Sequence, residues 1–148
     1  MTITNVSRSR EKSRIDASST AALVQKISDC CRREERVIAA YLFGSGAAGR
    51  LVAGSDIDVA VLVAAEHEAD FPALELAVSL EGTLGVPVDL IVLNRAGELL
   101  KHQVRRYGFL VYEKDPHRRK QFEVTGRKLY EDFLHLHRRY VATVLYQR

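Results

Sequence analysis

The sequence has little cysteine, little proline and no long apolar run, and each shortage excludes a class of protein. Its two cysteines, Cys30 and Cys31, are adjacent, so they cannot easily bond to each other and lack the spacing of a zinc site. With 3 prolines and 9 glycines among 148 residues, the chain is neither collagen-like nor of low complexity. No apolar run approaches the roughly 18 residues that a membrane helix needs, so we expect no membrane association.

The N-terminal segment also lacks an apolar stretch, so it does not have the pattern of a secretory signal. It is rich in serine, arginine and lysine, and we expect a flexible basic tail over residues 1–18. The rest, residues 19–148, is predicted to form a single domain, because 47% hydrophobic side chains suffice for one sizeable core. A reducing, cytoplasmic location is the expectation.

Charge is distributed unevenly along the chain. Residues 1–100 carry 10 basic and 14 acidic side chains, whereas residues 101–148 carry 12 basic and 5 acidic ones. A basic C-terminal third suits a surface for nucleic acid, nucleotide phosphates or an acidic protein, and it equally suits a solvated helix face. Charge alone does not decide between these interpretations. His102 suits a surface helix face better than a phosphate contact. The candidates for lining a ligand groove, for which a solvated face is the alternative, are Arg105, Arg106, Arg118, Arg119 and Lys120.

Apolar runs alternate with helical periodicities, and this pattern predicts a single α/β (α+β) domain. The predicted order is α-β-α-β-α-β-α-β-α, allowing a short helix after Gly44, with the helices packed on a small mixed sheet. Strands are predicted over residues 37–43, 57–63, 86–93 and 109–112. Helices are predicted from about residue 21 and over residues 71–84, 96–107 and 115–146.

Two of these helices have clear signals for their ends or faces. Gly85 is expected to end the helix 71–84, whose Leu74, Val78 and Leu84 lie on one side. Asp115 is expected to cap the long C-terminal helix. We expect Tyr130 and Tyr140 to pack that helix against the rest of the domain. The helix carries one apolar stripe, whose members are Phe122, Leu129, Phe133, Leu136, Tyr140 and Val144.

A turn of small residues follows the first predicted strand. It begins with Gly44 and Ser45 and continues as Gly-Ala-Ala-Gly. Small residues at a strand exit let the backbone approach a ligand closely, although most such turns are plain turns. The turn has neither the glycine spacing of a dinucleotide-binding motif nor the lysine of a P-loop.

Three aspartates lie at positions where an unpaired carboxylate is unfavourable in free energy. Asp56 and Asp58 are two apart at a predicted strand, so their side chains point to the same side. Asp89 interrupts the apolar run 86–93, and a strand placed beside the first would bring it to the same place. Three carboxylates beside a phosphate-binding turn suit one or two Mg²⁺ ions and a nucleoside triphosphate. An exposed strand end is the alternative interpretation.

The combined pattern resembles a known superfamily. Gly44 and Ser45, ten intervening residues, Asp56-x-Asp58 and a later strand carboxylate resemble the nucleotidyltransferases that include DNA polymerase beta. The short chain is similar to the minimal nucleotidyltransferase (MNT) branch of that superfamily. Residues 108–148 resemble, more loosely, the MNT antitoxins that are encoded beside HEPN ribonuclease toxins.

The resemblance implies a polymerase beta-like fold and a role for each residue that matches. Gly44 and Ser45 would bind the nucleotide phosphates. Asp56, Asp58 and Asp89 would be catalytic and would hold two Mg²⁺ ions, and Asp89 would also accept the proton of the attacking hydroxyl. The implied reaction transfers AMP from ATP to a tyrosine hydroxyl of a HEPN toxin, which inactivates the toxin.

The chain departs from the family pattern at two positions of the turn. Many family members carry basic residues where this sequence has Gly46 and Ala48, and only Arg50 follows. This motivates an alternative, an antitoxin that blocks its toxin sterically without catalysis. A nucleotidyltransferase with a small-molecule acceptor is a third hypothesis, and we do not expect a nucleic-acid partner because the chain has no room for a template-gripping domain.

Overall fold

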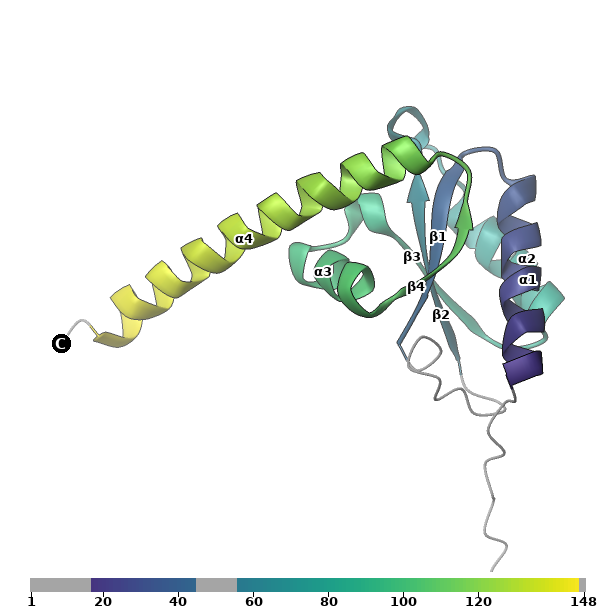
Figure 1. Cartoon of the computed structure of the whole chain (residues 1–148), viewed down its shortest axis with the longest axis horizontal. Coiled ribbons are helices and arrows are strands. Elements are labelled where there is room, and N and C mark those ends of the chain that lie inside the picture. The colour runs from purple at the N-terminus through teal and green to yellow at the C-terminus, as the bar shows by residue number, and fades with distance from the viewer. Residues whose placement is uncertain (1–16, 45–55, 147–148) are drawn as a thin grey trace, which may run out of the picture.

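The computed structural model describes residues 17–44 and 56–146 of the chain. Within them, four helices and four strands follow one another, with one 3₁₀ turn after β2 and another after β3 (Figure 1). The helices are α1 (Ala17–Arg33), α2 (Ala73–Leu84), α3 (Glu98–Tyr107) and α4 (Pro116–Tyr146). The strands are β1 (Val37–Phe43), β2 (Ile57–Val63), β3 (Val88–Val92) and β4 (Phe109–Glu113).

These bounds confirm the predicted strands and the mixed α/β class. The helix α1 begins at Ala17, so it includes two residues that we assigned to the preceding segment. The short helix that we allowed after Gly44 lies outside the described residues.

The four strands form one mixed sheet in the order β3-β2-β1-β4. β1 is antiparallel to both β2 and β4, whereas β2 and β3 are parallel. Parallel neighbours need a crossover connection, and α2 supplies it between β2 and β3. The parallel pair is important for the site because it aligns the beginnings of two strands at the same end of the sheet.

Helices cover both faces of the sheet, which explains why β1 and β2 are apolar at every position except Asp58. Figure 1 shows α1 and α2 on one face and α3, with the first part of α4, on the other. Along β2, Val59 and Val61 contribute to the core under α1 and α2. Ala60 and Leu62 contribute to the core under α3 and α4. Asp58 is in step with Ala60 and therefore belongs to the α3 and α4 face.

The buried face of α2 differs from the predicted one. Leu76 and Leu80 are buried, whereas the predicted contact residues Leu74 and Val78 are 78% and 59% exposed. Two residues correspond to about 200° around a helix, so the two pairs lie on nearly opposite sides. The C-terminal end is as predicted, since Gly85 adopts φ +70° and its N–H donates to the carbonyl of Glu81.

This difference predicts that shortening two leucines of the same helix has very different effects on stability. Leu80→Ala leaves a cavity in the core and is expected to lower the free energy of unfolding by about 2–5 kcal/mol. Leu74→Ala is expected to change it by less than about 0.5 kcal/mol, because that side chain is largely in water. Urea denaturation of the two variants measures both values, and equal losses would contradict the observed orientation of α2.

Hydrogen bonds and ion pairs fix the beginning of α4 to the sheet. The Asp115 carboxylate accepts a hydrogen bond from the N–H of Arg118 at 3.1 Å, which confirms the predicted cap. Glu123 accepts hydrogen bonds of 2.8 Å from both the Tyr41 hydroxyl and the Arg119 guanidinium. Arg118 and Arg119 were candidates for lining a ligand groove, but both pair with carboxylates of their own chain.

Beyond this attachment, α4 leaves the body of the molecule and projects as an arm (Figure 1). Phe122 packs against the core under α3 and α4. Farther along the stripe, Leu136, Tyr140 and Val144 are 64%, 65% and 56% exposed. The prediction that Tyr140 is packed is therefore wrong, because the domain ends before the helix does.

The two cysteines form no disulfide and lie on the buried side of α1, where they contribute to the core. Burial, reinforced by the neighbouring Cys30, raises the pKa of the Cys31 thiol to about 12. Such a thiol stays protonated and unreactive at neutral pH. In the described ranges of the chain, no helix combines the length and the apolar character that crossing a membrane requires.

Candidate active site

Two of the three predicted carboxylates meet where β2 and β3 run side by side. Asp58 and Asp89 are direct partners in the register of this parallel pair, so both side chains leave the sheet on the same face. β3 is an edge strand and Asp89 is exposed, whereas Asp58 is partly buried. The structure thus confirms that a neighbouring strand brings Asp89 to the aspartate pair.

Asp56 lies one residue before β2 and is exposed. The next residue, Ile57, donates its N–H to the carbonyl of Pro87 at 3.0 Å, which holds the entrance of β2 against the entrance of β3. Because Asp56 and Asp58 are two residues apart, they share a face. All three aspartates therefore lie at the same end of the same face of the sheet.

Burial and repulsion from the other carboxylates both raise the pKa of Asp58. Burial raises the pKa of the Asp58 carboxyl above its ordinary value of 3.8, and the negative charge of Asp89 raises it further. Asp56 adds a third, smaller contribution in the same direction. An ionised Asp58 is consequently unfavourable in the folded chain unless a positive charge joins the cluster.

This raised pKa makes a prediction about stability in a metal-free buffer. Stabilisation from Asp58 is complete below the pKa of its unfolded state and is lost as pH rises through the folded-state pKa. At pH 7, Asp58→Asn is therefore expected to melt above wild type. For a partly exposed group the gain is on the order of 0.5 kcal/mol, or roughly 1–2 °C. Thermal melts with a chelator at pH 4 and pH 7 test this, and a lower melting temperature of the variant at pH 7 would contradict it.

Gly44, the first residue of the predicted phosphate turn, lies directly against Asp58. It follows β1, whose last residue Phe43 pairs with Asp58, and it adopts φ +64°. A Cβ atom at this position would overlap the Asp58 carboxylate. Glycine is thus required both by the backbone conformation and by the space beside the carboxylate. Ser45, Gly46, Ala48 and Arg50 lie outside the described residues.

The donor set suits a divalent cation in its chemistry, since hard cations such as Mg²⁺ take carboxylate oxygens. A cation between the aspartates would also relieve the repulsion that raises the pKa of Asp58. Across residues 17–44 and 56–146, however, no three carboxylate, imidazole or thiol groups are arranged to surround an ion. The side chains would have to turn toward a bound ion.

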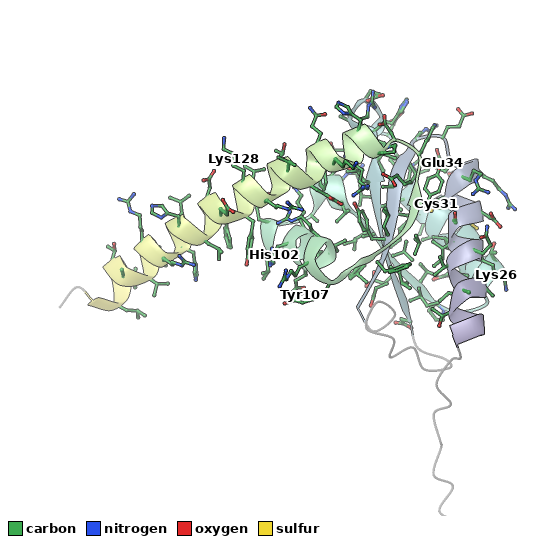
Figure 2. All side chains as sticks on the ribbon, in the orientation of Figure 1. Lys26, Cys31, Glu34, His102, Tyr107 and Lys128 are labelled. Atoms are coloured by element: carbon green, nitrogen blue, oxygen red, sulfur yellow. The ribbon has the colours of Figure 1, made fainter. Side chains whose placement is uncertain are left out.

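The structure also shows a cleft at two of the candidate groove residues, Arg105 and Arg106. A cavity of about 410 Å³ lies between α3 and α4, and Arg105, Arg106 and Arg127 line it. His102, on the α3 side of this cleft (Figure 2), stacks on Tyr130 with ring centroids 3.8 Å apart. We had interpreted His102 as a surface residue. Its contact crosses two helices, and no local sequence pattern indicates such a contact.

A larger cavity, of about 590 Å³, lies away from the aspartates. It is lined by residues such as Ile38, Ala64 and Arg118, which belong to the opposite end of the sheet. Arg118 there is already paired with Glu66. Its walls carry none of the three aspartates, so we place the candidate active site at the Asp58 end.

Three features define the class of nucleotidyltransferases predicted from the sequence. They are a glycine turn in contact with a carboxylate, two further carboxylates on the same face, and a small mixed sheet. The sequence profile of the family described as polymerase beta, nucleotidyltransferase, matches residues 25–117. This is more than half of the chain, which therefore belongs to the polymerase beta nucleotidyltransferase family. The match includes all three aspartates and ends where α4 begins.

Solved structures extend the comparison over most of the chain. A toxin–antitoxin structure with AMP-PNP is 28% identical, with a TM-score of 0.70 over 82% of this chain and 98% of that one. The MNT antitoxin in complex with a tri-AMPylated HEPN toxin from Shewanella oneidensis is 26% identical, with a TM-score of 0.67 over 85% and 98%. A double aspartate-to-glutamate mutant of a toxin–antitoxin pair is 26% identical, with a TM-score of 0.68 over 82% and 98%. No curated protein sequence matches the chain.

Proposed function

We propose that this protein is an antitoxin that transfers AMP from ATP to a tyrosine hydroxyl of a HEPN ribonuclease toxin and thereby inactivates it. The observation that carries the proposal is the convergence of Asp56, Asp58 and Asp89 beside Gly44 in a nucleotidyltransferase fold. The similar antitoxin structures support the acceptor, because one contains AMP-PNP and another an AMPylated HEPN toxin. The two unbonded cysteines agree with a cytoplasmic, reducing location.

In the proposed reaction, the hydroxyl oxygen forms a bond to the α-phosphorus of ATP while the bond to the β-phosphate breaks and pyrophosphate leaves. Asp89 is exposed at the edge strand, so an acceptor can approach it. We assign to Asp89 the role of the base that accepts the proton of the attacking hydroxyl. Asp56, Asp58 and Asp89 would hold Mg²⁺, in the two-ion arrangement that the family implies. Bound Mg²⁺ would stabilise the charge that develops on the attacking and leaving oxygens.

The glycine turn has the complementary task of binding the triphosphate. The bare backbone at Gly44 lets the Asp58 carboxylate lie against the turn, so phosphate oxygens bound near that carboxylate would also lie near a backbone N–H. We assign the Ser45 hydroxyl to the same phosphates. Because Gly46 and Ala48 supply no positive charge, the triphosphate depends on the metal ions and these few donors.

Neutralisation in cells tests this function against the steric alternative. Cells would express the product of the adjacent gene, as the candidate HEPN toxin, together with wild type, Asp56→Asn/Asp58→Asn or the control Asp70→Asn. We expect growth with wild type and with the control, and arrest with the double variant. Growth with the double variant would favour a steric antitoxin, the alternative that Gly46 and Ala48 motivate.

A further inference from the structure

The projecting part of α4 carries an apolar surface that its own chain leaves uncovered. We define the arm face as Leu129, Phe133, Leu136, Tyr140 and Val144, whose exposed fractions range from 41% to 65%. These residues recur at intervals of three and four, so they form one continuous ridge. Monomeric proteins seldom leave so long an apolar ridge in water, and such ridges mark sites of protein contact.

Three arginines line the cleft next to the arm face and outnumber its one acidic residue, Glu131. The cleft residue Tyr130 stacks on Phe133 of the arm face. Arg105 and Arg106 of α3 and Arg127 of α4 form no ion pair with a carboxylate in the described part of the chain. Gly126 permits this arrangement, since a Cβ there would overlap the Arg105 guanidinium. Clustered arginines without partners suit carboxylates supplied by another molecule.

The arm face also lies on the side of the sheet from which the aspartates are reached. Its ridge continues the line of Phe122, which packs on the core under α3 and α4. Asp58 belongs to that same face of the sheet through its step with Ala60. A partner seated under the arm and along α3 can therefore extend a side chain toward Asp58 and Asp89.

We propose that the arm face and the arginine cleft together dock the acceptor protein through an apolar helical ridge edged with aspartate or glutamate. This inference rests on the proposed function, because it identifies that partner with the protein that receives AMP. Both components of the surface are needed: the ridge supplies apolar area, and the arginines fix the orientation of the partner.

Two observations favour a protein of this kind over other occupants. Three of the five arm-face residues, Leu129, Leu136 and Val144, offer no flat ring for a nucleobase, and the Phe133 ring is already stacked against Tyr130 and His137. Five of the seven lysines and arginines of α4 lie before the arm face, against one of its three acidic residues, so this part of the helix attracts an acidic segment more than a second copy of itself.

Binding measured without nucleotide and with a chelator separates docking from chemistry. The probe is the purified product of the adjacent gene, tested as the candidate acceptor and titrated by calorimetry against wild type and three variants. Leu136→Glu/Tyr140→Glu changes two exposed side chains of the arm, and we expect it to raise Kd at least about 30-fold. Arg106→Glu/Arg127→Glu is expected to weaken binding and to reduce its dependence on salt.

The matched control is Leu74→Glu/Val78→Glu, which places the same two charges on exposed side chains of α2, on the opposite face of the sheet. We expect its Kd to stay within about 2-fold of wild type. Sedimentation of the chain alone and binding of a single-stranded RNA complete the test. A dimer or an RNA complex that Leu136→Glu/Tyr140→Glu abolishes would overturn the proposal, because another occupant would then use the arm face.

Failure of docking and failure of the proposed function give different results. Unchanged binding and AMP transfer in the arm variant would overturn the docking surface and leave the function intact. Arm-dependent binding by a wild-type chain that transfers no AMP would support the docking surface and contradict the function. Absence of any binding by wild type would overturn the docking proposal outright.

Discussion

Asp58→Asn is expected to lower the rate of AMP transfer by at least about 10²–10³-fold, which is the usual effect of removing one electrostatic contact to a reacting group. Asp58 is the central carboxylate of the three, since the charges of both Asp89 and Asp56 raise its pKa. An amide of nearly the same shape keeps the packing and removes the charge. The rate is measured as label transferred from ATP at saturating toxin.

The control for this variant is Asp70→Asn, which neutralises an exposed carboxylate before α2. We expect it to transfer AMP at the wild-type rate. Circular dichroism would show the same helix content in both variants. Transfer by Asp58→Asn within about 5-fold of wild type would contradict the assignment of this carboxylate to the reaction, because no essential electrostatic contact has so small an effect.

Gly44→Ala is expected to impair transfer almost as strongly, although it changes no charge. The added methyl group would overlap the Asp58 carboxylate, so the side chain or the turn must move. A displacement of about 1 Å at a catalytic group can lower a rate about 10²-fold. The left-handed conformation adds a loss of about 1–2 kcal/mol in the free energy of unfolding.

Gly85→Ala separates these two effects, because the chain offers a second glycine in the same conformation. Gly85 adopts φ +70° at the end of α2, and a Cβ there meets no neighbouring atom. We expect the same loss of stability as for Gly44→Ala, with AMP transfer unchanged. Equal transfer rates in the two variants would show that the contact between Gly44 and Asp58 has no catalytic importance.

The features that could be predicted from sequence are those that local patterns determine. Apolar runs located β1 and β2 to the residue, and Gly85 and Asp115 marked helix ends through backbone conformation and capping. The spacing of Asp56 and Asp58 indicated a shared face, because side chains alternate along any strand. The position of Asp89 followed once β3 was assumed to pair with β2.

The features that could not be predicted depend on contacts between distant elements. Both Leu74 and Leu76 fit an apolar helix face, and only the packing of α2 on the sheet decides which is buried. The stripe of α4 predicted burial correctly for Phe122, but periodicity does not show where the body of the domain ends. The convergence of Arg105 and Arg127 likewise depends on how α3 and α4 cross.

The exposed end of α4 lies outside the family match, which ends at residue 117. A nucleotidyltransferase site alone does not specify an acceptor, because the reaction at the α-phosphorus is the same for any hydroxyl. Acceptor choice must therefore come from surfaces outside the aspartate cluster. The arm face and its arginine cleft occupy the position where such a surface is needed.

The central claim is that this protein modifies a protein tyrosine with AMP, and intact mass spectrometry of the acceptor tests it most directly. The product of the adjacent gene, as the candidate acceptor, is incubated with ATP, Mg²⁺ and either wild type or Asp58→Asn. We predict that wild type adds one or more AMP units to a tyrosine of the acceptor and that the variant adds none. An acceptor of unchanged mass in a stable complex with wild type would contradict the account.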